Sequence, residues 1–304
     1  MATTYLFPGQ GSQYVGMGRN AYGESADARL IFEAADDLLG YKLSDLIFNG
    51  PEEKLTETQY QQPALFVASM ANWQRMLEEE WPTADYAAGH SLGEFTALAA
   101  AGAMTFSDGL KLVRKRGELM RQAGEISPGA MAAILALPVD EIETICAQAQ
   151  QETGKIVQVA NDNCPGQTVI SGDNAALQRA MELAGEAGAR RVVQLPISIA
   201  AHSPLMESVA GEFAEAVDAA PLYTPQIPVI GNVSAEPLQS IEDIRSELKA
   251  QLTLPVAWTP SMRWLLSAGS NTFIEAGPKD VLLGLLKRID RQAKRLAFDK
   301  AVEK

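Results

Sequence analysis

The chain has 304 residues, a length typical of about two domains of ~150 residues each. Hydrophobic residues make up 47% of it and charged residues 21%, which are ordinary values for a globular protein and exclude extensive disorder. A net charge of −13 repels phosphate backbones and anionic membranes on average, so the composition argues against a nucleic-acid-binding protein.

Neither a membrane span nor a disulfide framework is expected. The longest mostly apolar run, from Ala130 to Val139, is far shorter than the ~20 residues that cross a bilayer. The N-terminus lacks the basic segment and apolar core of a signal peptide. Cys146 and Cys164 are the two cysteines of the chain, and no Cys/His cluster suggests a metal site. We therefore expect a cytoplasmic protein with no metal and no membrane partner.

The first part of the chain predicts short strands followed by loops and helices. Residues 3–7 form an apolar run that Pro8-Gly9 ends, which indicates a strand and then a loop. A long helix is expected to open at Gln62-Pro63 and to run to residue 80. Residues 86–89 predict a second strand, and apolar residues at helical spacing follow it up to Gly102.

Residues 129–195 have the pattern of a small separate domain. Strands are expected at 131–137, 156–160, 167–171 and 191–195, helices at 140–151 and 175–187, and turn residues at 161–166. This β-α-β-β-α-β order is typical of a ferredoxin-like unit. We therefore expect an inserted subdomain at 129–195, with 1–128 and 196–304 forming an α/β domain around a mainly parallel sheet.

The pentapeptide Gly89-His90-Ser91-Leu92-Gly93 fits the G-x-S-x-G pattern of a nucleophile elbow. Its glycines allow a sharp turn between a strand and a helix, from which the serine hydroxyl projects. At a helix N-terminus, the dipole and the free N–H groups stabilise a developing negative charge. Five residues also match by chance, but the strand and helix patterns on either side favour Ser91 as a nucleophile.

A serine nucleophile needs a base, usually a histidine, and this chain has two. His90 adjoins Ser91 within the turn and should point away from its hydroxyl, so we expect it to be structural or to line the pocket. By elimination, His202 is the candidate base. The alternative is that His202 is an ordinary surface or core histidine.

Residues 108–122 have the spacing of an amphipathic helix with one arginine on its apolar side. At ~100° per residue from Leu110, Val113 lies near roughly 300° and Leu112 near roughly 200°, and Arg116 falls between them at about 240°. An unpaired buried charge is costly, so this arginine needs an anionic partner. The partner is either a protein carboxylate, the commoner case, or a substrate carboxylate held by the guanidinium.

The glycine-rich segment at 8–13 follows the first predicted strand. It lacks the G-K-[ST] ending of a phosphate-binding loop. A plain β-turn is the simpler interpretation. The functional alternative is that it supplies a backbone N–H donor that completes an oxyanion hole together with the N–H of Leu92.

Several segments, in a fixed order, carry a resemblance to a known family. They are Phe-Pro-Gly-Gln-Gly-Ser-Gln at 7–13, Thr-Gln-Tyr-Gln-Gln-Pro-Ala-Leu at 58–65, Gly-His-Ser-Leu-Gly-Glu-Phe at 89–95, Arg-Gly-Glu-Leu-Met at 116–120, Gly-Ala-Met-Ala-Ala-Ile at 129–134, Cys-Pro-Gly-Gln-Thr-Val-Ile-Ser-Gly at 164–172, Ala-His-Ser-Pro-Leu-Met at 201–206 and Glu-Ala-Gly-Pro at 275–278. Over about residues 3–290 the chain resembles the malonyl-CoA:acyl carrier protein transacylases of fatty acid synthesis. It also resembles the related acyltransferases of polyketide synthases.

The resemblance implies an α/β-hydrolase-like core with an inserted ferredoxin-like subdomain. It implies that a malonyl group passes from malonyl-CoA to the phosphopantetheine thiol of acyl carrier protein by a ping-pong mechanism through malonyl-Ser91. Thioesters are the substrates, and no metal or redox cofactor is expected. We expect a monomer with no nucleic-acid partner.

The resemblance also assigns the reacting groups. Ser91 would be the acylated nucleophile and His202 the general acid and base. The backbone N–H groups of Gln10 and Leu92 would form the oxyanion hole. The backbone carbonyl of Gln251 would orient His202 in place of the acid of a catalytic triad.

The same resemblance assigns substrate contacts. Arg116 would bind the free carboxylate of the malonyl group, and Gln62 would line the pocket beside it, with His90 close by. The chain departs from many relatives ahead of the histidine, where Ile199-Ala200-Ala201 replace a phenylalanine-containing segment. It also has Gly277-Pro278-Lys279 where relatives often have Gly-Pro-Gly.

Two other functions remain open on the same machinery. One is a discrete polyketide synthase acyltransferase, and the other is an acyl-carrier-protein thioesterase or hydrolase. Arg116 on the apolar side of the predicted helix argues against a thioesterase that removes neutral acyl chains.

Because acyl carrier proteins are acidic, docking would need a local basic patch. The candidates, which could also be ordinary solvated charges, are Lys287, Arg288, Arg291, Lys294, Arg295, Arg190 and Arg191.

Overall fold

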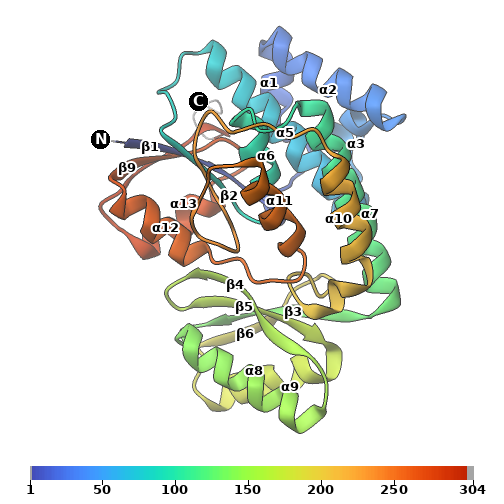
Figure 1. The fold of residues 1–304 in the computed structure, drawn as a ribbon, viewed down its shortest axis with the longest axis vertical. Coiled ribbons are helices and arrows are strands. Elements are labelled where there is room, and N and C mark those ends of the chain that lie inside the picture. The colour runs from blue at the N-terminus through green and yellow to red at the C-terminus, as the bar shows by residue number, and fades with distance from the viewer. Residues whose placement is uncertain (1, 300–304) are drawn as a thin grey trace.

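The computed structural model describes residues 2–299, which fold around two sheets. The larger sheet lies in the upper body of Figure 1 among most of the helices, and the smaller one lies below it with two helices of its own. The strands are β1 (Ala2–Phe7), β2 (Tyr86–Gly89), β3 (Gly129–Leu135), β4 (Val157–Cys164), β5 (Gln167–Asp173), β6 (Arg191–Gln194), β7 (Val229–Ile230), β8 (Pro237–Leu238), β9 (Ser270–Glu275) and β10 (Lys294–Ala297).

The helices fill the intervals between these strands, and most of them lie around the larger sheet. They are α1 (Arg19–Glu24), α2 (Ala26–Leu39), α3 (Leu43–Asn49), α4 (Glu52–Leu55), α5 (Thr58–Glu78), α6 (Gly93–Ala100), α7 (Phe106–Ile126), α8 (Val139–Thr153), α9 (Asn174–Glu186), α10 (Glu207–Ala219), α11 (Ile241–Ala250), α12 (Trp258–Ser267) and α13 (Val281–Ile289), with a 3-10 turn at Pro204–Met206. None of the helices within residues 2–299 is long and apolar enough to cross a membrane.

The larger sheet has the strand order β10-β9-β1-β2-β7-β8, and only β8 pairs antiparallel. Its central strand β1 is buried on both faces, as is usual for a parallel sheet. Tyr5 and Phe7 pack edge-on against Trp73 of α5 on one face. Leu6 belongs to the core on the other face, which includes Trp258 of α12 and Leu286 of α13. The prediction of a mainly parallel sheet covered by helices is confirmed.

The smaller sheet is antiparallel, with the order β4-β5-β3-β6. That order is the one produced by a ferredoxin-like β-α-β-β-α-β chain. Helices α8 and α9 cover its lower face in Figure 1, and they share an apolar core with the strands, separate from the cores of the larger sheet. The elements of this sheet span residues 129–194, so the expected ferredoxin-like subdomain is present. The division into two domains with the boundaries given above stays a prediction.

Two predicted element boundaries are wrong. Helix α5 begins at Thr58 rather than at Gln62-Pro63. A proline within the helix removes one N–H donor, but burial of most of α5 from Thr58 onward stabilises the turn before it. The segment predicted as turn residues at 161–166 is mostly strand, because β4 continues to Cys164 with two irregularities in its pairing to β5. Such bulges re-aim side chains, and here they direct the polar residues of β4 toward the region between the two sheets.

Candidate active site

Ser91 lies at the turn from β2 into α6, with its backbone in the left-handed region at φ 52°. A non-glycine residue in that region is strained and calls for local support. The turn is also tightly packed, because a Cβ atom on Gly93 would lie 1.9 Å from the carbonyl oxygen of Phe7. The G-x-S-x-G segment therefore forms a nucleophile elbow that is pressed against the end of β1.

The hydroxyl of Ser91 meets the imidazole of His202. Ser91 Oγ lies 2.8 Å from His202 Nε2, and His202 Nδ1 lies 2.8 Å from the backbone oxygen of Gln251. A carbonyl oxygen only accepts, so Nδ1 carries the proton and donates it to Gln251. Nε2 is then unprotonated and accepts from the serine hydroxyl. The pair is thus arranged for removal of the serine proton.

Arg116 is buried beside the same hydroxyl, with an exposed fraction of 1%. Its Nη2 group donates to Ser91 Oγ at 3.0 Å and to Gln251 Oε1 at 2.9 Å, and its Nη1 group donates to Gln62 Oε1 at 2.9 Å. The guanidinium also lies over the ring of Phe95. Among residues 2–299 no carboxylate forms a salt bridge with it, and its Nε atom has no hydrogen-bond partner. The helical spacing therefore correctly predicts that Arg116 is buried, but no carboxylate among the described residues pairs with it directly.

The electrostatics of the site keep His202 neutral. Burial, and after it the positive charge of Arg116, lower the pKa of His202 to about 3. Burial lowers the pKa of Arg116 to about 10, against the opposing effect of Glu94, so the guanidinium stays charged near neutral pH. A neutral histidine beside a charged guanidinium can act as a base over a wide pH range.

Two backbone donors lie close to the nucleophile. In the described part of the chain, neither the N–H of Gln10 nor that of Leu92 donates a hydrogen bond within the protein. A Cβ atom on Gly9 would lie 2.3 Å from the oxygen of His90 and 3.7 Å from the nitrogen of Leu92, so the loop at 8–13 packs directly on the elbow. This geometry favours the oxyanion-hole interpretation of the loop over a plain turn.

A cavity of about 250 Å³ opens in front of Ser91 and His202. It is lined by the loops that follow β1 and β2, by strands β3, β4 and β5 of the smaller sheet, and by the start of α13. Arg116, Gln62 and Gln251 do not line it, and instead lie behind the serine. The lining residues are Gly9, Gln10, Ser12, His90, Ser91, Met120, Met131, Ala133, Asn161, Asn163, Gln167, Val169, Leu195, Ile197, Ala201, His202, Val281, Leu282 and Leu285.

Comparison with known proteins identifies the family. Residues 4–301 match the acyl transferase domain model. The chain belongs to the acyl transferase domain family. Over 293 residues it is 45% identical to a malonyl CoA-acyl carrier protein transacylase of Bacillus subtilis (strain 168), covering 96% of this chain and 92% of that protein.

Solved structures agree with this assignment. A malonyl CoA-acyl carrier protein transacylase from Coxiella burnetii superposes with a TM-score of 0.95 at 39% identity, covering 98% of this acyltransferase and 94% of that chain. A malonyl-transacylase solved in complex with a type II PKS acyl-carrier protein superposes with a TM-score of 0.94 at 38% identity, covering 98% and 96%. The identity is high enough for the likeness to extend beyond the fold to the family.

His90 of the acyltransferase lies in the pocket wall, away from the base position. Its Nε2 atom lies 2.8 Å from Asn163 Oδ1, and its ring packs against Trp258. Burial lowers the pKa of His90. The hydrogen bond to Asn163 of β4 attaches the elbow to the smaller sheet, so this histidine connects the two parts of the site.

Three residues of the site have no signal that the sequence analysis used. Asn232 accepts from the Ser91 N–H at 2.7 Å and donates to the Gly89 oxygen at 2.7 Å. Glu94 is fully buried behind the elbow, and Gln158 donates to the His202 oxygen at 2.8 Å. Glu94 could have been noticed as a charged residue among apolar ones at the start of α6. Asn232 and Gln158 carry no local pattern, because their partners are distant in sequence.

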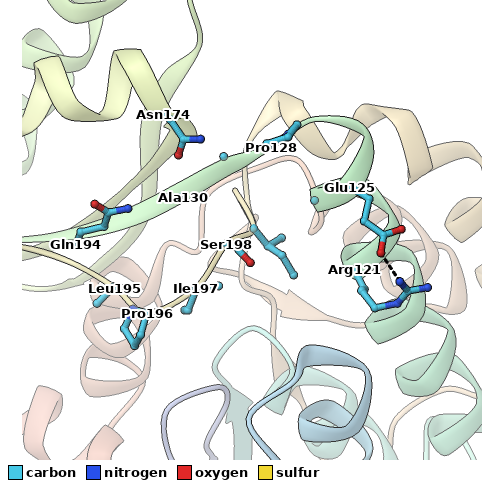
Figure 2. Close-up of a pocket in the computed structure, with 13 residues that line it drawn as sticks. Arg121, Glu125, Pro128, Ala130, Asn174, Gln194, Leu195, Pro196, Ile197 and Ser198 are labelled. Atoms are coloured by element: carbon cyan, nitrogen blue, oxygen red, sulfur yellow. Dashed lines mark hydrogen bonds and ion pairs between the residues drawn. The ribbon is translucent and has the colours of Figure 1, made fainter. Parts of the chain in front are cut away.

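A larger hollow of about 580 Å³ is lined in part by the segment at 195–199 (Figure 2). Arg121 and Glu125 of α7 pair with each other at its edge, and Leu195 and Ile197 line both hollows. Both histidines of the chain line the smaller cavity and neither lines this one. The acyltransferase chemistry therefore belongs to the smaller cavity.

Residues 2–299 contain no cluster of His, Cys, Asp or Glu side chains that could hold a metal ion. The expectation that no cofactor is needed stays a prediction.

The lowered pKa of His202 predicts how acylation depends on pH. Only the neutral imidazole accepts the Ser91 proton, so the acid limb of the acylation rate should lie well below the ordinary histidine value of 6.5. Removing the nearby charge in Arg116→Gln raises the His202 pKa, so activity should begin to fall at a higher pH. Acylation rates measured by rapid quench with acetyl-CoA, between acid and neutral pH, give the pH at which the rate falls on the acid side.

The matched control is Arg114→Gln, which removes an arginine of the same helix that pairs with Glu118 on a solvent-exposed face. This variant should keep the wild-type limb. An Arg116→Gln limb that coincides with wild type would contradict the electrostatic explanation.

Proposed function

We propose that this acyltransferase transfers a malonyl group from malonyl-CoA to the phosphopantetheine thiol of an acyl carrier protein through a malonyl ester of Ser91. The observation that carries the proposal is a buried guanidinium 3.0 Å from the hydroxyl of a serine that is itself bonded to a neutral histidine. The names of the relatives support the same substrates. The two free, buried cysteines are consistent with the cytoplasmic location we expect.

The first half-reaction forms the acyl-enzyme. His202 Nε2 takes the Ser91 proton while Oγ attacks the thioester carbonyl of malonyl-CoA. The carbonyl oxygen becomes an oxyanion that the N–H groups of Gln10 and Leu92 stabilise. The C–S bond then breaks, and the proton on His202 passes to the CoA sulfur.

The second half-reaction reverses these roles. The phosphopantetheine thiol gives its proton to His202 as its sulfur attacks the ester carbonyl of malonyl-Ser91. Collapse of the second tetrahedral intermediate breaks the C–O bond, and the proton returns to Ser91 Oγ. An acyl group moves between sulfur and oxygen with no change in oxidation state, so neither half-reaction calls for a redox group.

Arg116 is proposed to select acyl groups that end in a carboxylate. Its Nη2 group now contacts the free hydroxyl of Ser91, and its Nε atom is buried without a partner. Once Ser91 is acylated, these donors are placed for the second carboxylate of the bound acyl group. A guanidinium–carboxylate pair in a dry site is stronger than in water, which favours malonyl over neutral acyl groups.

The hydrolase alternative is less well supported. A thioesterase for neutral acyl chains gains nothing from a buried cation behind the nucleophile, which costs energy to desolvate. The polyketide synthase acyltransferase shares the chemistry proposed here and differs in the carrier protein that it serves.

The carrier protein is proposed to dock on basic residues around α13. Lys287 of α13 and Arg291 just after it are exposed, and Val281 and Leu285 of the same helix line the cavity. Arg288 has a different role, because its guanidinium donates to the oxygens of Pro165 and Gly166. It therefore ties α13 to the β4–β5 turn, and a charge change there would disturb the site itself.

Formation of the acyl-enzyme is the direct test of the proposed function. Wild-type protein mixed with malonyl-CoA should gain one malonyl group by intact-mass spectrometry, and peptide mapping should place it on Ser91. Ser91→Ala should gain none. A wild-type protein without the adduct, or an equal adduct on the alanine variant, would refute the nucleophile assignment.

Arg116→Ala should lower the rate for malonyl-CoA more than that for acetyl-CoA. A charge-assisted hydrogen bond contributes about 1.5–3 kcal/mol, so the ratio of the two kcat/KM values should fall by roughly 10- to 100-fold. Steady-state kinetics with both thioesters measure the ratio. An unchanged ratio means that the guanidinium does not bind the acyl carboxylate.

Charge reversal at Lys287 and Arg291 should raise the KM for acyl carrier protein and leave the rate of malonyl-Ser91 formation unchanged, because the encounter depends on charge complementarity. Lys155→Glu is the control, since this exposed lysine precedes β4 at the end away from the cavity. If the double reversal and the control give the same carrier-protein kinetics, the docking site is elsewhere.

A further inference from the structure

The buried carboxylate of Glu94 has no part in the reaction steps above, although it lies directly behind the nucleophile. It is 0% exposed and follows Ser91 by three residues, within the first turn of α6. Its Oε1 atom accepts from the Asn232 N–H at 2.9 Å, and its Oε2 atom accepts from the Gln251 side-chain amide. A buried carboxylate is costly, so its retention at this place calls for a reason.

The two partners of Glu94 are the residues that support the strained elbow. Asn232 bonds to the Ser91 N–H and to the Gly89 oxygen through its side chain. Gln251 Nε2 donates to the Ser91 oxygen at 3.0 Å. The N–H and the carbonyl oxygen of Ser91 are therefore bound by Asn232 and Gln251, and Glu94 accepts a hydrogen bond from each of these two residues.

The orientation of the Gln251 amide follows from the chemistry of its neighbours. Arg116 only donates, so Gln251 must present its oxygen there, and the Ser91 carbonyl only accepts, so Gln251 must present its nitrogen there. Glu94 accepts the remaining amide hydrogen and completes the arrangement. A flipped amide would place NH₂ against the guanidinium and an oxygen against both the carboxylate and the carbonyl.

The same arrangement places the carboxyl group of Glu94 one amide away from Arg116. Glu94 favours the charged form of Arg116, although no salt bridge joins the two among residues 2–299. Burial and the neighbouring Glu247 raise the pKa of Glu94 well above its usual range, against the hydrogen bonds from Asn232 and Gln251. A direct pair would occupy the guanidinium donors that a substrate carboxylate needs. With the Gln251 amide between them, Arg116 keeps its Nε atom without a partner.

We propose that Glu94 is a positioning residue: through Gln251 and Asn232 it fixes the strained backbone of Ser91 and the orientation of the Gln251 amide that faces Arg116. It touches neither the substrate nor the reacting atoms. The inference rests on the proposed function, because the effect it predicts is on acylation of Ser91.

The test is single-turnover acylation of Glu94→Gln, followed by intact-mass spectrometry with malonyl-CoA and, separately, with acetyl-CoA. The substitution keeps the shape of the side chain and replaces one of its two acceptor oxygens by an NH₂ donor. A nucleophile displaced by about 1 Å loses roughly 100-fold in rate. We therefore expect the maximal rate constant to fall about 10- to 100-fold with both thioesters, while the half-saturating concentration changes less than about threefold.

The amplitude of the reaction separates positioning from folding. Partly unfolded protein would acylate a smaller fraction of molecules at the normal rate, whereas a displaced Ser91 acylates all molecules slowly. Full amplitude with a reduced rate constant supports the proposal. Reduced amplitude with a normal rate constant, or a normal rate constant at full amplitude, overturns it.

Glu247→Gln is the matched control. Glu247 is another buried carboxylate near Glu94, but its side chain accepts from the Val233 N–H and the Ser234 N–H and bonds to neither the Gln251 side chain nor the Ser91 backbone. It should acylate within about threefold of the wild-type rate. Equal slowing in both variants would show that loss of any buried carboxylate there has the effect, and would overturn the specific role of Glu94.

Two further arms keep the result interpretable. If Glu94→Gln does not fold, Glu94→Asp keeps the carboxyl group and shortens its reach, and the same reduced rate at full amplitude is expected. A wild-type rate in that variant overturns the proposal. Wild-type protein is run in parallel. Absence of a malonyl adduct on wild type rejects the proposed function, whereas a normal wild type together with a normal Glu94→Gln variant rejects only this inference.

Discussion

The site depends on one buried charge, the guanidinium of Arg116. Its desolvation is offset by three neutral acceptors and by the face of Phe95. That charge in turn determines the state of its neighbours. It helps to keep His202 unprotonated, and it donates to Ser91 Oγ so that the serine proton points to the imidazole. Charge burial, serine polarisation and the preference for an acidic acyl group are therefore consequences of the same residue.

A large part of this arrangement could be predicted from the sequence because it is local. The elbow is a pattern of five consecutive residues between a strand and a helix. The burial of Arg116 follows from helical periodicity, which places it between Val113 and Leu112 on the apolar face. His202 followed by elimination from two histidines. In each case neighbours in sequence, or a count of rare residues, carry the information.

The rest could not be predicted because it depends on partners distant in sequence. Asn232 supports Ser91 from 141 positions away, and Gln251 from 160. No periodicity marks either residue, and the direction of the Gln251 amide is decided only when its three neighbours meet. The polar residues after Ala160 resemble a turn, yet they form an irregular strand, because Asn161 and Asn163 line the cavity instead of solvent.

Strand β4 belongs to the smaller sheet and is also hydrogen-bonded to Val256. The Val256 N–H donates to the Ala160 oxygen, and the Val256 oxygen accepts from the Asp162 N–H, so the strand is joined to the segment that follows Gln251. Gln158 donates to the carbonyl oxygens of both His202 and Thr253. The smaller sheet therefore helps to hold the backbone around His202 in place. A chimaera that exchanges the smaller sheet and its helices between relatives would have to include residues 251–257. These residues pair with β4 and also contain Gln251, which orients His202.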